Sequence, residues 1–145
     1  MAIARRFDIA CLIEDDAELA AALEADGVAV AADMAAYRAA RARLGEAAIV
    51  GVHCPASRHV AMELGEAGAD YVGFAGDDGM LAWWSELFTV PSVALDAVAG
   101  ERARAVIATG ADFIRPDDGM WTAPGRARKT IAALSRIIDA QDGEG

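Results

Sequence analysis

Ionisable side chains stand at the ends of all six short apolar runs of the sequence, and four of these residues are candidates for chemistry. Asp15 and Asp33 follow the first two runs, His53 ends the third, and Arg115 follows the sixth. Carboxylates at neighbouring strand ends suit Mg²⁺, which prefers one or two carboxylates together with water and phosphate oxygens. An imidazole titrates near neutral pH and can act as a general base. We therefore predict Asp15 and Asp33 as metal ligands, His53 as the catalytic residue and Arg115 as the phosphate-binding residue.

Asp33, His53 and Arg115 each also have a purely structural interpretation. Asp16 and Asp33 each precede a predicted helix, and Asp commonly caps a helix N-terminus. His53 can be a polar residue at a barrel mouth with its hydrogen bonds satisfied. Arg115 can form an ion pair with a nearby carboxylate, namely Asp96, Asp117 or Asp118. Cys54 cannot supply a nucleophile to His53, because adjacent strand residues point to opposite faces.

The phrase Asp-Asp-Gly-Met occurs twice, at 77–80 and 117–120, each time before tryptophan. One interpretation is a pair of matched loops over one site. The other is that each Asp caps a helix, while the tryptophans pack against neighbouring helices or a partner chain.

The elements that must position these residues alternate between two periodicities. Short apolar runs typical of strands occupy 7–13, 27–30, 49–53, 71–74, 92–95 and 112–114. Amphipathic patterns typical of helices occupy about 16–25, 33–44, 57–67, 80–88, 100–109 and 125–140. Two helices end in the phrase Gly-Ala-Asp before the next strand, at 68–70 and 110–112, and a third ends in Glu-Ala-Asp at 24–26. Together with the alternating patterns, this repeat predicts six βα units.

Nearly continuous apolar strands indicate a parallel sheet covered by helices, and hence an α/β fold. The uniform units predict part of a TIM (β/α) barrel that lacks the first two units; the alternative is an open doubly wound parallel sheet. We expect one domain over residues 1–145. Unpaired edge strands at 7–13 and 112–114 predict a homodimer, because exposed edges invite pairing with another chain.

Composition excludes several classes of function. The 145 residues carry 13 basic and 23 acidic side chains, a net charge of −10, and 55% of them are hydrophobic. A surface with this negative charge repels phosphate backbones and anionic lipids. We therefore expect neither nucleic acid nor membrane as a partner. No apolar stretch approaches the length of a membrane helix, and Cys11 and Cys54 imply no disulfide framework. We expect a cytoplasmic protein.

Four phrases carry a resemblance to a known family: Cys-Leu-Ile-Glu-Asp at 11–15, Ala-Asp-Gly-Val at 25–28, Ile-Val-Gly-Val at 49–52, and Glu-Ala-Gly-Ala-Asp-Tyr-Val-Gly-Phe at 66–74. From residue 7 to about 140, the chain resembles thiamine-phosphate synthase and its thiazole-tautomerase relatives, a (β/α)-barrel family. The resemblance implies that the chain begins at the third barrel strand, without the strand whose Gln, Arg and Lys hold pyrophosphate. It also implies Mg²⁺ at Asp15, where the family has Asn-Asp and this chain has Glu14-Asp15.

The resemblance implies a role in thiamine biosynthesis, in which a synthase joins an aminopyrimidine pyrophosphate to a thiazole phosphate. Here the family's Gly-Gly phosphate turn is replaced at 95–98, and its Pro-Thr-x-Thr-Lys grip is missing at 75–78. We therefore expect a degenerate or weakly active transferase of this type that binds a small phosphorylated ligand. The alternative is a non-catalytic binding or self-assembly module on the same scaffold.

Overall fold

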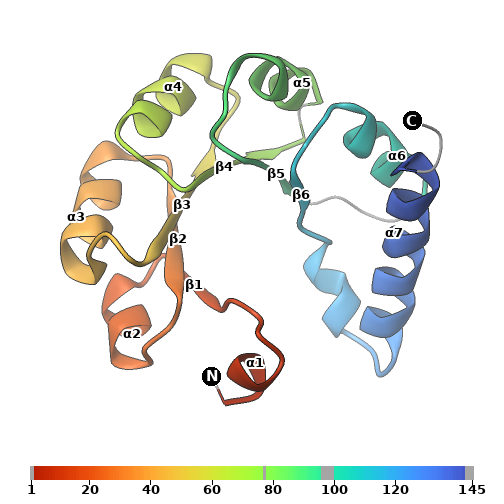
Figure 1. The fold of residues 1–145 in the computed structure, drawn as a ribbon, viewed down its shortest axis with the longest axis horizontal. Coiled ribbons are helices and arrows are strands. Elements are labelled where there is room, and N and C mark those ends of the chain that lie inside the picture. The colour runs from red at the N-terminus through yellow and green to blue at the C-terminus, as the bar shows by residue number, and fades with distance from the viewer. Residues whose placement is uncertain (1, 77, 96–99, 143–145) are drawn as a thin grey trace. The chain divides into compact units, whose positions relative to one another are not determined.

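Strands and helices alternate along the part of the chain that the computed structural model describes, residues 2–76, 78–95 and 100–142 (Figure 1). The chain divides into two units, Met1–Gly73 and Phe74–Gly145. In both units the strand order follows the sequence. Right-handed crossovers that always lead to the next strand in the same direction place all the helices on one face of the sheet. A doubly wound sheet instead reverses its strand order and carries helices on both faces.

The first unit contains a short N-terminal helix followed by βα units. Its elements are α1 (Ala2–Arg6), β1 (Leu12–Glu14), α2 (Ala17–Ala22), β2 (Gly27–Ala31), α3 (Met34–Leu44), β3 (Ile49–Cys54), α4 (Arg58–Glu66) and the start of β4 (Tyr71–Ala75). Helices α2, α3 and α4 lie on the same side of β1, β2 and β3 (Figure 1). This arrangement leaves the opposite face of the strands without a helical cover from this unit.

The strand register of the first unit separates its side chains into two faces. Strands β1 and β2 pair in parallel with Glu14 opposite Ala29, and β2 pairs with β3 so that Ala31 lies opposite His53. The alternate residues form the buried helix-side core, which includes Val28, Val30, Val50 and Val52. Because side chains alternate along a strand, Glu14 and His53 share the face that the helices leave uncovered.

The second unit has the same order of elements and ends in a long helix. It contains α5 (Asp78–Leu87), β5 (Ser92–Leu95), α6 (Glu101–Ala108), β6 (Phe113–Ile114), the 3₁₀ helix η1 (Asp118–Trp121) and α7 (Arg126–Asp142). Trp84 is buried, stacks on Phe88 with ring centroids 4.2 Å apart, and donates its indole N–H to the Val90 carbonyl at 2.7 Å. Leu134 and Ile137 of α7 complete the core between α6 and α7.

The repeated aspartate before the strands has a common structural role. In each case its carboxylate accepts the backbone N–H at the start of the preceding strand. The pairs are Asp26 with Cys11 (2.7 Å), Asp70 with Val50 (2.7 Å) and Asp112 with Ser92 (2.8 Å). Such charge-assisted bonds satisfy amides at the amino ends of the strands, so the repeat stabilises the scaffold at the end away from the predicted site.

The first predicted strand is shorter than expected. The pattern predicts a strand over 7–13, but β1 begins at Leu12. The Phe7 amide bonds back to the Ala4 carbonyl at 3.0 Å, and Asp8 has a φ of 54°. A left-handed residue interrupts an extended strand, so the apolar residues before β1 form a turn instead.

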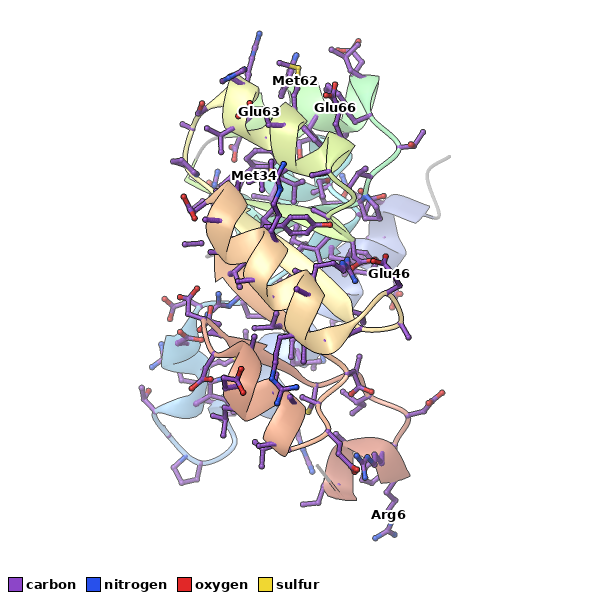
Figure 2. All side chains as sticks on the ribbon, turned by 90° about the vertical axis from the view of Figure 1, so that its left-hand side faces the viewer. Arg6, Met34, Glu46, Met62, Glu63 and Glu66 are labelled. Carbon is purple, nitrogen blue, oxygen red and sulfur yellow. The ribbon has the colours of Figure 1, made fainter. Side chains whose placement is uncertain are left out.

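The outer helix faces of the first unit carry exposed acidic residues. Figure 2 shows Glu63 and Glu66 on α4 and Glu46 after α3. His59 lies on the same surface, 3.5 Å from Glu63. Within the described ranges, every helix is too short or too polar to cross a membrane.

Candidate functional site

The backbone turns sharply at Asp15, directly after β1. Its φ is 52°, a left-handed conformation that non-glycine residues adopt at a cost of about 1 kcal/mol. The Asp15 amide donates to the Ala29 carbonyl at 2.8 Å, and its Oδ1 accepts the Ala31 amide at 3.0 Å. These two bonds hold the Asp15 carboxylate at the carboxyl end of β2, next to its own strand.

Asp33 lies at the same strand end and caps α3. Its amide donates to the Ala31 carbonyl at 2.7 Å, while its Oδ1 accepts the Ala36 amide at 2.8 Å. Asp16 caps α2 in the same way through the Leu19 amide. The structural interpretation of Asp33 is therefore confirmed, and its role as a metal ligand stays a prediction.

The chemistry of Asp15 and Asp33 suits a hard cation. Each uses Oδ1 to accept an amide, and Oδ2 of Asp15 accepts no hydrogen bond from the described part of the chain. No group of three or more His, Cys, Asp or Glu residues placed to hold a metal occurs among the described residues. Mg²⁺ needs only one or two carboxylates when phosphate and water complete its octahedron, so these two residues fit Mg²⁺ with a phosphorylated ligand.

His53 lies beside an acidic residue whose role was missed in the sequence. Its Nδ1 is 3.8 Å from Oε1 of Glu14, and its side chain is 23% exposed. Glu14 precedes the predicted ligand Asp15, and the motif alone assigned it no function. The strand register could have revealed this pair. Glu14 lies level with Gly51 of β3, and His53 follows two residues later, so both side chains fall on the same face of the sheet.

The ring of Tyr71, from β4, lies over Gly51 of β3 and near the ring of His53. The two rings are 6.4 Å apart between centroids. A Cβ at Gly51 would lie 1.9 Å from the Tyr71 ring, so glycine at this strand position makes the space that the phenol ring occupies. Glu14, His53 and Tyr71 thus form a polar cluster on the uncovered face of the first unit, and we call it the strand-face cluster.

Cys54 is directed away from this cluster. It is buried, and burial raises the pKa of its thiol to about 12 by disfavouring the thiolate. Because the thiolate is the nucleophilic form, Cys54 stays inert at neutral pH. The expectation that it does not act with His53 agrees with this placement.

We expect iodoacetamide at neutral pH to modify Cys11 in the folded protein and to spare Cys54, because Cys11 is partly exposed. Peptide mass spectrometry measures both sites. In urea both should react, and a Cys11→Ser variant should take up no label when folded. Native labelling of Cys54 at a rate similar to that of Cys11 would contradict this.

Arg115 lies in the second unit, where its guanidinium pairs with Asp118 at 3.4 Å and its amide donates to the Ala94 carbonyl. The side chain remains one-third exposed. Asp117 instead accepts the Gly119 amide and caps η1, and Asp96 lies outside the described residues. The ion-pair interpretation of Arg115 is thus confirmed for Asp118, and phosphate binding stays a prediction.

The two Asp-Asp-Gly-Met phrases have different local roles. Asp78 begins α5 and forms an ion pair with Arg102 of α6, whereas Asp77 lies outside the described residues. The second phrase forms η1, at whose end Trp121 is exposed. The structural interpretation is therefore confirmed for Asp117, which caps η1, and for Trp84, which is buried, but not for Trp121, which is exposed.

A family model described as thiamine monophosphate synthase matches residues 1–76 of the chain. The chain is 39% identical over 154 residues to thiamine-phosphate synthase of Erythrobacter litoralis, covering 96% of this chain and 71% of the relative. It is 38% identical over 144 residues to thiamine-phosphate synthase of Rhodospirillum centenum, covering 90% and 70%.

Solved structures of two other proteins resemble this chain in fold. Thiamine phosphate pyrophosphorylase from Pyrococcus furiosus superposes with a TM-score of 0.84 at 25% identity, covering 96% of this chain and 72% of that one. Orotidine 5'-phosphate decarboxylase from Pyrococcus horikoshii superposes with a TM-score of 0.70 at 14% identity, covering 94% and 77%, which is a likeness of fold alone. Together with the sequential strand order, these similarities confirm the predicted α/β fold of six βα units as part of a (β/α) barrel.

Proposed function

Because the chain belongs to the thiamine monophosphate synthase family, we propose that it is a weakly active thiamine-phosphate synthase-like protein of thiamine biosynthesis. Its reaction would join an aminopyrimidine pyrophosphate to a thiazole phosphate and expel pyrophosphate. The observation that carries the proposal is the placement of the Asp15 carboxylate at the end of β2, where one oxygen accepts the Ala31 amide and the other accepts no hydrogen bond from the described residues. A cytoplasmic location is part of the same proposal.

We assign separate tasks to the residues at the strand ends. Asp15 and Asp33 would hold Mg²⁺, which would neutralise charge on the departing pyrophosphate. His53 has Glu14 at its Nδ1, and its imidazole would exchange a proton with a ligand. Arg115 would contact a phosphate oxygen while retaining its ion pair with Asp118.

Three features support weak rather than full activity. Glu14 places a negative charge where the family resemblance implies a neutral Asn, and a carboxylate beside the site repels pyrophosphate. The ion pair with Asp118 competes with phosphate for Arg115. The residues at 75–78 lack the family's phosphate grip, so fewer donors would stabilise the leaving group.

Asp15→Asn should abolish the binding of pyrophosphate in the presence of Mg²⁺. Isothermal titration of the wild-type chain should give saturable heat, because Asp15 supplies a carboxylate oxygen that the amide of Asn replaces only as a weak ligand. Asp16→Asn is the matched control, since it removes the same charge one residue away and Asn caps a helix as well as Asp does. Equal heats for wild type and Asp15→Asn would reject the metal assignment.

A second candidate is a non-catalytic self-assembly module, which the exposed Phe113 and Trp121 favour. Chromatographic assay of thiamine phosphate formed from the two substrates distinguishes the candidates. Slow, Mg²⁺-dependent turnover that Asp15→Asn removes and Asp16→Asn retains would support the synthase. A chain with neither turnover nor pyrophosphate heat would support the module.

A further inference from the structure

Glu14 lies on the uncovered face of the first unit, two strands away from the histidine that it contacts. The strands follow one another as β1, β2 and β3, so Glu14 of β1 and His53 of β3 stand on either side of β2. Neighbouring strands lie about 4.8 Å apart. Oε1 of Glu14 nevertheless comes within 3.8 Å of Nδ1 of His53, so the carboxylate reaches across a whole strand to meet the imidazole.

Small residues on β2 keep the path between the two side chains open. On this face Ala29 lies level with Glu14, and Ala31 lies level with His53. Each alanine carries a single methyl group, so neither blocks a carboxylate that extends over the strand. A larger side chain at either position would stand between Glu14 and His53. The contact therefore depends on residues from three strands.

Tyr71 approaches His53 from β4, on the opposite side of β3 from β2. Its ring lies over Gly51, the residue two positions before His53. The two ring centroids are 6.4 Å apart and the ring planes are inclined by 42°, a geometry typical of aromatic pairs. Glu14 and Tyr71 thus flank the imidazole from the two neighbouring directions along the sheet and restrict its orientation.

The charge on Glu14 favours a proton on the imidazole nitrogen that faces it. A separation of 3.8 Å is too long for a hydrogen bond and acts through charge. In a neutral imidazole one ring nitrogen carries the proton, and the neighbouring groups decide which. A carboxylate beside Nδ1 attracts an N–H dipole and repels a lone pair. The adjacent carboxylate, Asp15, is instead bound to the Ala31 amide.

We propose that Glu14 is a positioning residue for His53, which orients the imidazole and holds a proton at Nδ1. His53 then presents one defined tautomer to a ligand, as a residue that exchanges a proton requires. The part of this role that concerns turnover rests on the proposed synthase activity, whereas the control of the tautomer does not. Because the same carboxylate repels pyrophosphate, Glu14 should have opposite effects on ligand binding and on turnover.

Long-range proton–nitrogen NMR of the imidazole rings tests the proton position without an assay of activity. The chain has two histidines, and the 77% exposed His59 of α4 is the internal reference. At about pH 8.5, where an ordinary imidazole is neutral, wild-type His53 should be protonated mainly at Nδ1. Glu14→Gln should raise the fraction protonated at Nε2 roughly threefold or more. Glu46→Gln, which removes an exposed carboxylate before β3, should change neither histidine.

Turnover tests whether this arrangement of His53 serves the reaction. Glu14→Gln should lower kcat about tenfold or more, because a misplaced proton donor or acceptor loses much of its effect. KM for the pyrophosphate substrate should not rise, because a repelling charge is gone. In a His53→Gln background the same change should lower kcat no further, since Glu14 acts through His53. Glu46→Gln should leave both constants unchanged.

Three results would overturn the proposal. They are an unchanged His53 spectrum in folded Glu14→Gln, an unchanged kcat when that spectrum does change, and a further loss of kcat in the His53→Gln background. A wild-type chain without turnover would reject the synthase activity, and the His53 spectrum would still decide the positioning role. Circular dichroism verifies that each variant is folded.

Discussion

Replacing Arg41 with alanine should lower the free energy of unfolding of the first unit by about 3 kcal/mol. The Arg41 guanidinium joins α3 to two neighbouring segments. It donates to four acceptors: the carbonyls of Gly45, Ala48 and Gly68 and the carboxylate of Asp70. Its side chain is only 14% exposed, so the variant would remove a largely buried donor from all four acceptors.

The charge on Arg41 is secured by its surroundings. Burial alone disfavours the cation, but the bonds to Asp70 and Tyr37 outweigh it and hold the pKa of Arg41 above its ordinary value. Asp70 in turn accepts the Val50 amide. Loss of Arg41 therefore loosens the aspartate that anchors the start of β3.

Urea titration followed by circular dichroism measures this loss, and hydrogen exchange at the Val50 amide locates it. Arg38→Ala is the matched control, because Arg38 lies one turn earlier on α3 and is exposed; it should change stability by less than about 0.5 kcal/mol. Arg41→Lys should recover only part of the loss, since an ammonium cannot reproduce the planar fork. Equal stability of Arg41→Ala and Arg38→Ala would refute the assigned role.

Gly27→Ala should destabilise the first unit by about 3 kcal/mol or more, because a Cβ there would lie 2.0 Å from the Ile49 carbonyl oxygen. Backbone atoms of the paired strand cannot move aside as a flexible side chain can. The β2–β3 register must shift or open to admit the methyl group. Since Glu14 and His53 meet through this register, the same variant should also disturb the strand-face cluster.

Gly45→Ala provides the contrast. Gly45 has a φ of 81° and a ψ of 179°, a conformation essentially restricted to glycine, so alanine there costs about 1–3 kcal/mol of backbone strain. A Cβ at this position would meet nothing within 4 Å, so no steric overlap adds to that cost. Thermal unfolding of the two variants ranks the effects. If Gly45→Ala proved the more damaging, the close approach of Gly27 to β3 would not be the constraint that requires glycine there.

The alternation of strand and helix patterns determined the βα order, and Asp15, Asp33, His53 and Arg115 could be located at strand ends without coordinates. Local signals suffice there, because side-chain periodicity and helix capping depend on residues a few positions apart. The first strand was placed too early because the turn at Asp8 depends on bonds to α1. The repeated Gly-Ala-Asp phrase was visible in the sequence, but its partners across the sheet were not.

Only the tertiary structure decided which of these residues interact. The pairing of Glu14 with His53, the anchoring of Asp15 to β2 and the ion pair that engages Arg115 each depend on contacts between separate segments. A motif specifies residue types along one chain segment, whereas strand register and side-chain packing set distances between segments far apart in sequence.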